Sequence, residues 1–140
     1  MATKVSDQRQ REISASFPRT VTYVLSNVDF GAGTTNHAIK APAGYSSGIL
    51  LDVGVAVSET FTDDTTVAFV RIGTAGDADA YAELGMATAA ATNFFNTQDD
   101  TNAILSKEVP ASSQLEVACI APTGGTPAGI GDVHIVIDWF

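Results

Sequence analysis

The sequence predicts an all-β domain: an antiparallel β-sandwich of the jelly-roll type, with an extended N-terminal arm and at most one short helix. Apolar and polar residues alternate with a period of two along several stretches of the 140-residue chain, as in half-buried strands. Gly, Pro and Asp separate these stretches, as turns require. No repeat with a period of about 20 to 50 residues is present, so a single sandwich is expected rather than a repeat array.

Residues 1–19 are expected to form the arm, and residues 20–140 the sandwich. The arm sequence is polar, lacks periodicity and ends near Phe17-Pro18, where proline prevents a helix from continuing. A short helix over residues 6–13 is the alternative. Seven or eight strands are expected after the arm, in chain order at residues 20–30, 36–40, 49–61, 66–72, 102–107, 114–121 and 131–140.

Two strands near the middle of the chain give the strongest signals. The odd positions from Ile49 to Val57 are all apolar, which predicts one continuous core-facing row. Residues 66–72 are apolar on both faces, so we expect their outer face to be covered. The cover is either the Ala-rich segment 78–91, with Asp77 as the N-cap of one or two helical turns, or another subunit.

The last strand alternates clearly between an apolar and a polar face. The inward set is Val133, Ile135, Ile137 and Trp139, and the outward set is Asp132, His134, Val136 and Asp138. Side chains two residues apart on a strand are separated by about 7 Å. Asp132 and Asp138 are therefore too far apart to share a metal ion, and the outward set is expected to be a solvated or interface face.

The charge balance excludes some partners and favours others. The formal net charge is −9, which argues against nucleic acid, because phosphate binding needs clustered Lys and Arg. Charged residues make up 16% of the chain, against roughly 25% in ordinary soluble domains, and charge depletion is typical of interface cores. We therefore expect an oligomer. No apolar run long enough for a membrane span is present, so no membrane association is expected.

The positive charge is concentrated in the arm. Residues 1–19 have a local balance of +2, which leaves −11 for residues 20–140.

The single cysteine, Cys119, shares a strand face with Leu115 and Val117, so we expect a buried, unreactive thiol.

Candidate catalytic and metal motifs have simpler structural interpretations. Residues 44–48 match the G-x-S-x-G pattern around Ser46, but a Pro-Gly turn precedes it and a strand follows, whereas a hydrolase elbow needs a strand and then a helix. His37 and His134 are expected on polar strand faces. The acidic pairs, which are turn formers and caps, lie at Asp63-Asp64, at Asp77 with Asp79, and at Asp99-Asp100. We expect no enzymatic activity, no cofactor and no metal.

Two stretches carry a family resemblance. VAFVRIGTAGDADAYAEL, residues 67–84, and GTPAGIGDVHIVIDWF, residues 125–140, resemble small virion proteins of tailed bacteriophages. These include jelly-roll capsid decoration, or cement, proteins, which assemble mostly as trimers on the outer capsid surface. The resemblance implies the major capsid protein and further copies of the same chain, as a homotrimer, as partners. It implies no catalytic residue.

The residues expected to contact the capsid or a neighbouring subunit are the basic and aromatic groups of the arm and two adjacent rings in an expected loop: Lys4, Arg9, Arg11, Phe17, Arg19, Phe94 and Phe95. Two adjacent bulky rings in a loop cannot easily both point inward, which favours an intersubunit contact. The alternative function is a receptor- or glycan-binding module of a phage tail fibre or spike.

Overall fold

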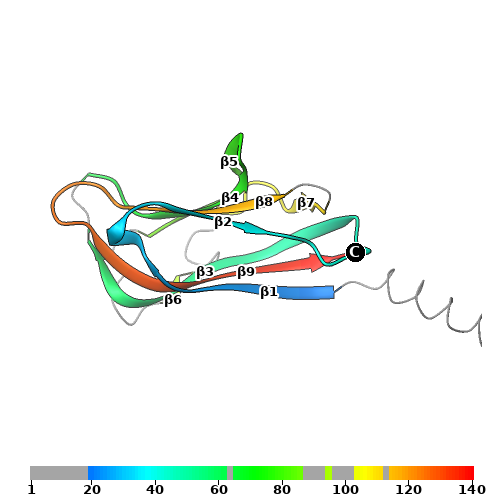
Figure 1. Cartoon of the computed structure of the whole chain (residues 1–140), viewed down its shortest axis with the longest axis horizontal. Helices are drawn as coiled ribbons and strands as arrows, with labels where there is room; N and C mark the ends of the chain where they lie inside the picture. The colour runs from blue at the N-terminus through cyan, green and yellow to red at the C-terminus, as the bar shows by residue number, and fades with distance from the viewer. Residues whose placement is uncertain (1–18, 63–64, 87–93, 96–102, 112–113) are drawn as a thin grey trace, which may run out of the picture.

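The computed structural model describes residues 19–62, 65–86, 94–95, 103–111 and 114–140. These residues form two antiparallel β-sheets packed face to face, which confirms the predicted β-sandwich (Figure 1). The predicted arm, apart from Arg19, lies outside the described residues.

Nine strands and one short 3-10 helix make up the described chain. They are β1 (Arg19–Asp29), η1 (Phe30–Ala32), β2 (Thr35–Ile39), β3 (Ser47–Thr62), β4 (Phe69–Thr74), β5 (Asp77–Gly85), β6 (Phe94–Phe95), β7 (Glu108–Pro110), β8 (Leu115–Ile120) and β9 (Ala128–Trp139). Most of the predicted strands are present within a few residues of their expected bounds.

The strand pairing is that of a jelly roll. Pairs are nested from the chain ends toward the middle: β1 with β9, β2 with β8, β3 with β6 and β7, and β4 with β5. Successive pairs alternate between the two sheets, and the contacts of β9 with β3 and of β8 with β4 join them into the orders β1-β9-β3-β6 and β2-β8-β4-β5. This is a long hairpin rolled into a double sheet.

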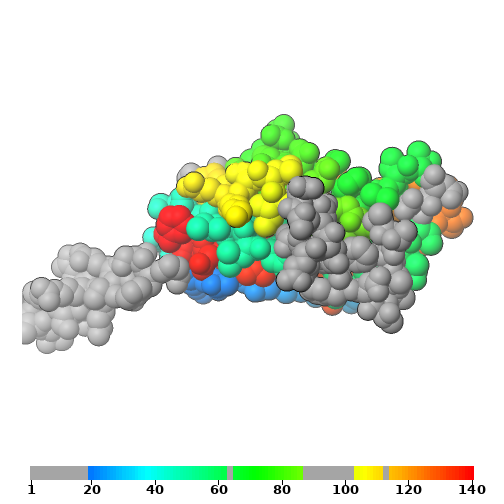
Figure 2. Space-filling model, turned by 180° about the vertical axis from the view of Figure 1, so that it is seen from behind, coloured from blue at the N-terminus to red at the C-terminus, as the bar shows by residue number. Residues whose placement is uncertain are grey.

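One side of the sandwich is closed by the segment before β7. Leu105 N–H donates to the carbonyl of Tyr81 in β5 (2.9 Å), and Leu50 N–H in β3 donates to the carbonyl of Lys107 (2.6 Å). Residues 103–110 thus run from an edge of one sheet to an edge of the other, as Figure 2 shows in yellow. On the opposite side, β1 and β2 each pair with a single described strand and leave an edge open.

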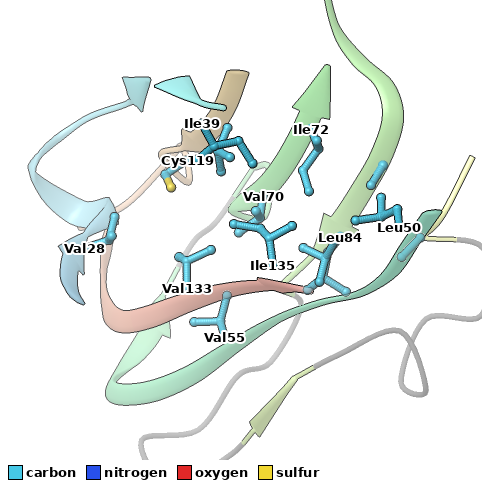
Figure 3. Close-up of a cluster of buried hydrophobic side chains, with 14 of the residues drawn as sticks. Val28, Ile39, Leu50, Val55, Val70, Ile72, Leu84, Cys119, Val133 and Ile135 are labelled. Carbon is cyan, nitrogen blue, oxygen red and sulfur yellow. The ribbon is translucent and has the colours of Figure 1, made fainter. Parts of the chain in front are cut away.

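The core is a dry layer between the sheets. Val133 and Ile135 of β9 point toward Val70 and Ile72 of β4 (Figure 3), and all four side chains are fully buried. The predicted inward row of β9 is confirmed, because Ile137 and Trp139 are also 0% exposed. Among the described residues no polar or charged side chain is buried, so apolar burial, at roughly 25 cal/mol per Å², stabilises this layer.

The continuous apolar row predicted for β3 is wrong in its first half. A β-bulge lies between Leu50 and Asp52 in the pairing with β9. Leu50 is 1% exposed and Val53 is 0% exposed, whereas Ile49 and Leu51 are 37% and 47% exposed. An extra residue in one strand shifts the alternation by one position. The bulge therefore places Ile49 and Leu51 on the outer face.

The helix predicted after Asp77 is also wrong. Residues 77–85 form β5, an edge partner of β4, so Asp77 is a strand residue rather than an N-cap. Residues 78–85 consequently lie beside β4 instead of over its outer face. Val67, Phe69 and Arg71 are partly exposed there, and Arg71 covers the Phe69 ring at 5.0 Å from its centroid.

Two further expectations near residue 100 are corrected. Phe94 and Phe95 are not in a loop: they form β6, paired with Ala56 and Val55. In place of the strand predicted at residues 102–107, the described part has an isolated bridge between Ile104 and Ala82, and the strand β7 comes later. The conformation of a short segment with weak alternation depends on the sheet edge that it pairs with more than on its own sequence pattern.

A hydrogen-bond chain links the two sheets at the open side. The buried indole N–H of Trp139 donates to the Tyr23 hydroxyl (3.0 Å), and this hydroxyl donates to the carbonyl of Lys40 after β2 (2.8 Å). Tyr23 is therefore both the acceptor for a buried donor and the connection between β1 and the end of β2.

We expect Tyr23→Phe to lower the free energy of unfolding by about 1–3 kcal/mol, because the Trp139 N–H loses its acceptor inside the core. Urea denaturation followed by tryptophan fluorescence measures the change. Tyr45→Phe is the matched control, since Tyr45 also packs against the core but no hydrogen bond joins its hydroxyl to a described residue, and it should cost about 0.5 kcal/mol or less. Equal losses in the two variants would contradict this role of Tyr23.

Candidate interaction surface

The outer face of the β1-β9-β3 sheet is the strongest candidate for a functional surface. The register places Val24 beside His134, Thr22 beside Val136, and Val136 beside Asp52. All of these side chains point away from the core, because the alternate positions of the three strands point inward. The predicted outward set of the last strand is therefore confirmed as one continuous face with parts of β1 and β3.

This face carries an apolar stripe, which consists of Val24, Val136, Leu51 and Ile49. Val24 is 57% exposed, Leu51 47% and Ile49 37%, while Val136 is half-buried. These residues come from three adjacent strands, and their cross-strand partners are polar: Val24 pairs with His134, and Ile49 pairs with Asp138. Single exposed aliphatic residues are normal, whereas several on one sheet face make that face a candidate interaction site.

Polar side chains of the same face are bound to individual partners. His134 Nε2 lies 3.1 Å from Asp52 Oδ2, between side chains that are 16% and 27% exposed. Asp138 accepts from the Thr20 hydroxyl at 2.7 Å. Asp132 accepts from the backbone N–H of Asn27 at 2.8 Å, which supports the positive φ of 52° at the β1 bulge. The three outward polar side chains of β9 thus have three different partners.

The face is acidic. Three aspartates lie on it, Asp52, Asp132 and Asp138, whereas the only Lys or Arg in β1, β3 and β9 is Arg19, at the first position of β1. A partner for this face must supply apolar surface and must not bring a concentration of negative charge.

The predicted contact residues are only partly placed. Arg19 is exposed and pairs through its backbone with Trp139, at the end of the sheet where the arm joins. Lys4, Arg9, Arg11 and Phe17 lie outside the described residues. The backbone of Phe94 and Phe95 forms β6, which pairs with β3, one of the three strands that carry the stripe.

The sequence pattern assigned Ile49 and Leu51 to the core, and it did not single out Val24 as a surface residue. The Leu50-Leu51 pair interrupts strict alternation and is the one signal that a bulge is possible there. On the outer face of β4, Arg71 Nε donates to Glu83 Oε2 at 2.6 Å across the β4–β5 pair.

The motifs with possible catalytic chemistry are separated in the fold. Ser46 precedes β3, and its hydroxyl donates to the carbonyl of Phe140 at 3.5 Å. His37 Nε2 lies 3.2 Å from the Thr35 hydroxyl, and His134 pairs with Asp52. Within the described ranges no group of three or more His, Cys, Asp or Glu is arranged for a metal ion. The pairs 63–64 and 99–100 lie outside those ranges.

A search for membrane-crossing helices found none of sufficient length and apolarity in the part of the chain that the structure describes.

Comparisons with known proteins give matches among solved structures. No family model matches the chain, and no curated protein matches it in sequence. Among solved structures, a chain of the acidic stable capsid of the Helicobacter pylori bacteriophage KHP30 is similar at 16% identity and a TM-score of 0.49, covering 89% of this chain and 94% of that chain. A chain of the cyanophage Pam1 capsid asymmetric unit is similar at 13% identity and a TM-score of 0.49, covering 89% and 87%. The fold assignment rests on the strand order given above.

Cys119 is buried as expected, with 0% of its surface exposed. Burial raises the pKa of its thiol from 9.0 to about 11, although the Thr35 hydroxyl partly opposes this shift. The thiolate therefore does not form at neutral pH in the folded protein, and the group is unsuited to nucleophilic chemistry.

We expect Cys119 to be inert toward a thiol reagent in the native protein at pH 8 and to react fully in urea. Because the folded pKa lies above the unfolded value, its contribution to stability is constant below pH 9 and is lost as the pH rises toward 11. The free energy of unfolding should fall by about 2–3 kcal/mol over this pH range. The Cys119→Ala variant should not show this fall. Rapid native labelling would contradict the burial argument.

Proposed function

We propose that this protein is a capsid decoration, or cement, protein of a tailed bacteriophage, acting by binding and not by catalysis. In this role it lies on the outer surface of the capsid, contacts the major capsid protein and assembles with other copies of itself, as a homotrimer. The proposal combines the family resemblance of residues 67–84 and 125–140 with the apolar stripe on the β1-β9-β3 face.

The apolar stripe is the observation that carries the proposal. Covering the exposed parts of Val24, Ile49 and Leu51 contributes on the order of 1 kcal/mol for each side chain. The stripe lies on the outer face of a sheet, which suits the broad surface of a protein partner better than it suits a small ligand, since small-ligand sites are concave.

The charge distribution supports bridging of two neighbouring subunits. The stripe is bordered by carboxylates, whereas the arm carries Lys4, Arg9 and Arg11 and joins β1 at Arg19. Surfaces of opposite charge prefer different counterparts. One chain can therefore hold one capsid subunit with its sheet face and reach an acidic patch on the next with its arm, so that interface area resists the pressure of packaged DNA.

The location of the protein on the particle separates this proposal from the alternative of a receptor- or glycan-binding tail module. Electron cryomicroscopy of the intact virion should show the sandwich on the outside of the head. Density confined to the tail would refute the decoration role. The mass of the purified protein in solution tests the trimer, and a monomer at all concentrations would contradict it.

We expect the double variant Val24→Lys/Leu51→Lys to remain folded and to bind capsids lacking the protein at least about tenfold more weakly, because both side chains are exposed and their apolar contacts would be replaced by charges that must be desolvated. Sedimentation with such capsids measures the affinity. Leu105→Lys is the matched control: Leu105 is 58% exposed but lies on the segment that closes the other side. Equal loss in the control would remove the assignment to this face.

We also expect deletion of residues 2–18, which preserves Arg19 and β1, to reduce occupancy on capsids and to weaken its dependence on salt, because three basic residues are removed. A variant with Lys4, Arg9 and Arg11 replaced by Gln is the control for chain length. Full occupancy with the deleted chain would show that the arm has no part in binding.

A further inference from the structure

A second surface of the molecule is a groove on the other sheet. It has a volume of about 320 Å³ and is lined by Asn36, His37, Ala38, Ala75, Gln114 and Glu116. These residues belong to β2, to the start of β8 and to the turn between β4 and β5, which rises from the outer side of the sheet in Figure 1. The groove therefore lies between a raised turn and an open sheet edge.

The register directs the polar groups of the lining outward. Leu115 and Val117 of β8 are buried, so Gln114 and Glu116 point to the outer face. Ala38 pairs with Glu116, and Asn36 lies two residues earlier on the same side of β2. Two carboxamides and a carboxylate thus border one hollow, with Ala38 and Ala75 as small apolar surfaces.

The terminal groups of these three side chains are available to a ligand. No hydrogen bond joins the side chain of Asn36, Gln114 or Glu116 to another residue within the described part of the chain. Together they offer amide donors, amide acceptors and a charged acceptor. Such a mixed set complements a molecule with several hydroxyl groups, each of which donates and accepts.

The lining also disfavours other classes of ligand. No Lys or Arg borders the groove, and the chain carries a net charge of −9, so phosphates and acidic sugars are repelled. The lining holds no large aliphatic side chain, and its one ring is the polar imidazole of His37, so a lipid or an apolar peptide side chain has little to anchor it. The volume lies at the small end of ligand sites, of about 300–1,000 Å³, which suits a single sugar ring or a disaccharide.

We infer that this groove binds a neutral carbohydrate, with Glu116 and Asn36 bonded to ring hydroxyls and Gln114 at the rim. The groove lies on the outer side of the β2-β8-β4-β5 sheet, and the apolar stripe lies on the outer side of the other sheet. Both surfaces can therefore be occupied at once, and the inference stands independently of capsid binding.

The test is a titration of the ¹⁵N-labelled full chain with D-glucose, D-galactose, D-mannose and N-acetyl-D-glucosamine, followed by amide chemical shifts. We expect at least one sugar to give saturable shifts confined to residues 36–38, 75 and 114–116, with a Kd on the order of 1 mM. Glu116→Gln and Asn36→Ala should each weaken binding about tenfold, since the first replaces a charge-assisted hydrogen bond by a weaker neutral one and the second removes a hydrogen bond.

Glu108→Gln is the matched control, because Glu108 is an exposed glutamate on β7, outside the groove, and it should bind as the unaltered protein does. The absence of saturable shifts with all four sugars up to about 100 mM would overturn the inference. Shifts that survive both groove substitutions would overturn it as well. Tighter binding of a lysine or arginine derivative at Glu116 would instead identify the groove as a contact for a protein side chain. Capsid binding, measured separately, is unaffected by any of these outcomes.

Discussion

The inward row of β9 is the constraint on which the rest of the structure depends. β9 is the central strand of its sheet, paired with β1 on one side and with β3 on the other. Val133, Ile135, Ile137 and Trp139 are all fully buried, and Val133 and Ile135 face the side chains of the opposite sheet in Figure 3. Because strand side chains alternate, fixing this row inward also fixes His134, Val136 and Asp138 outward. The core and the candidate surface are therefore two sides of one strand.

A single extra residue determines what the candidate surface can bind. With strict alternation, Ile49 and Leu51 would point to the core, and the outer face of β3 would present Leu50 and Asp52. The bulge between Leu50 and Asp52 instead exposes Ile49 and Leu51 while keeping Val53 buried. Bulges are frequent next to functional sites because they redirect side chains without breaking a sheet. The shift in side-chain alternation at the bulge thus gives this face two of its exposed apolar residues.

The two outer faces differ in chemistry as well as in position. One carries the exposed apolar residues of the stripe together with aspartates, which suits a protein surface. The other holds a small hollow bordered by Asn36, Gln114 and Glu116, which suits a hydroxyl-rich molecule. A sandwich places such faces on opposite sides, since its core occupies the space between them. One small domain can therefore bind a large partner on one side while its other side remains accessible.

The sequence alone determined the all-β class, the bounds of most strands, the inward row of β9 and the burial of Cys119, because alternation and turn residues are local properties. Only the tertiary structure decided the bulge in β3, the strand at residues 77–85 in place of a helix, and the meeting of Val24, Val136 and Leu51 on one face. These depend on cross-strand register and on which edge a segment meets. Both are set by residues far apart in the chain, and no local pattern encodes them.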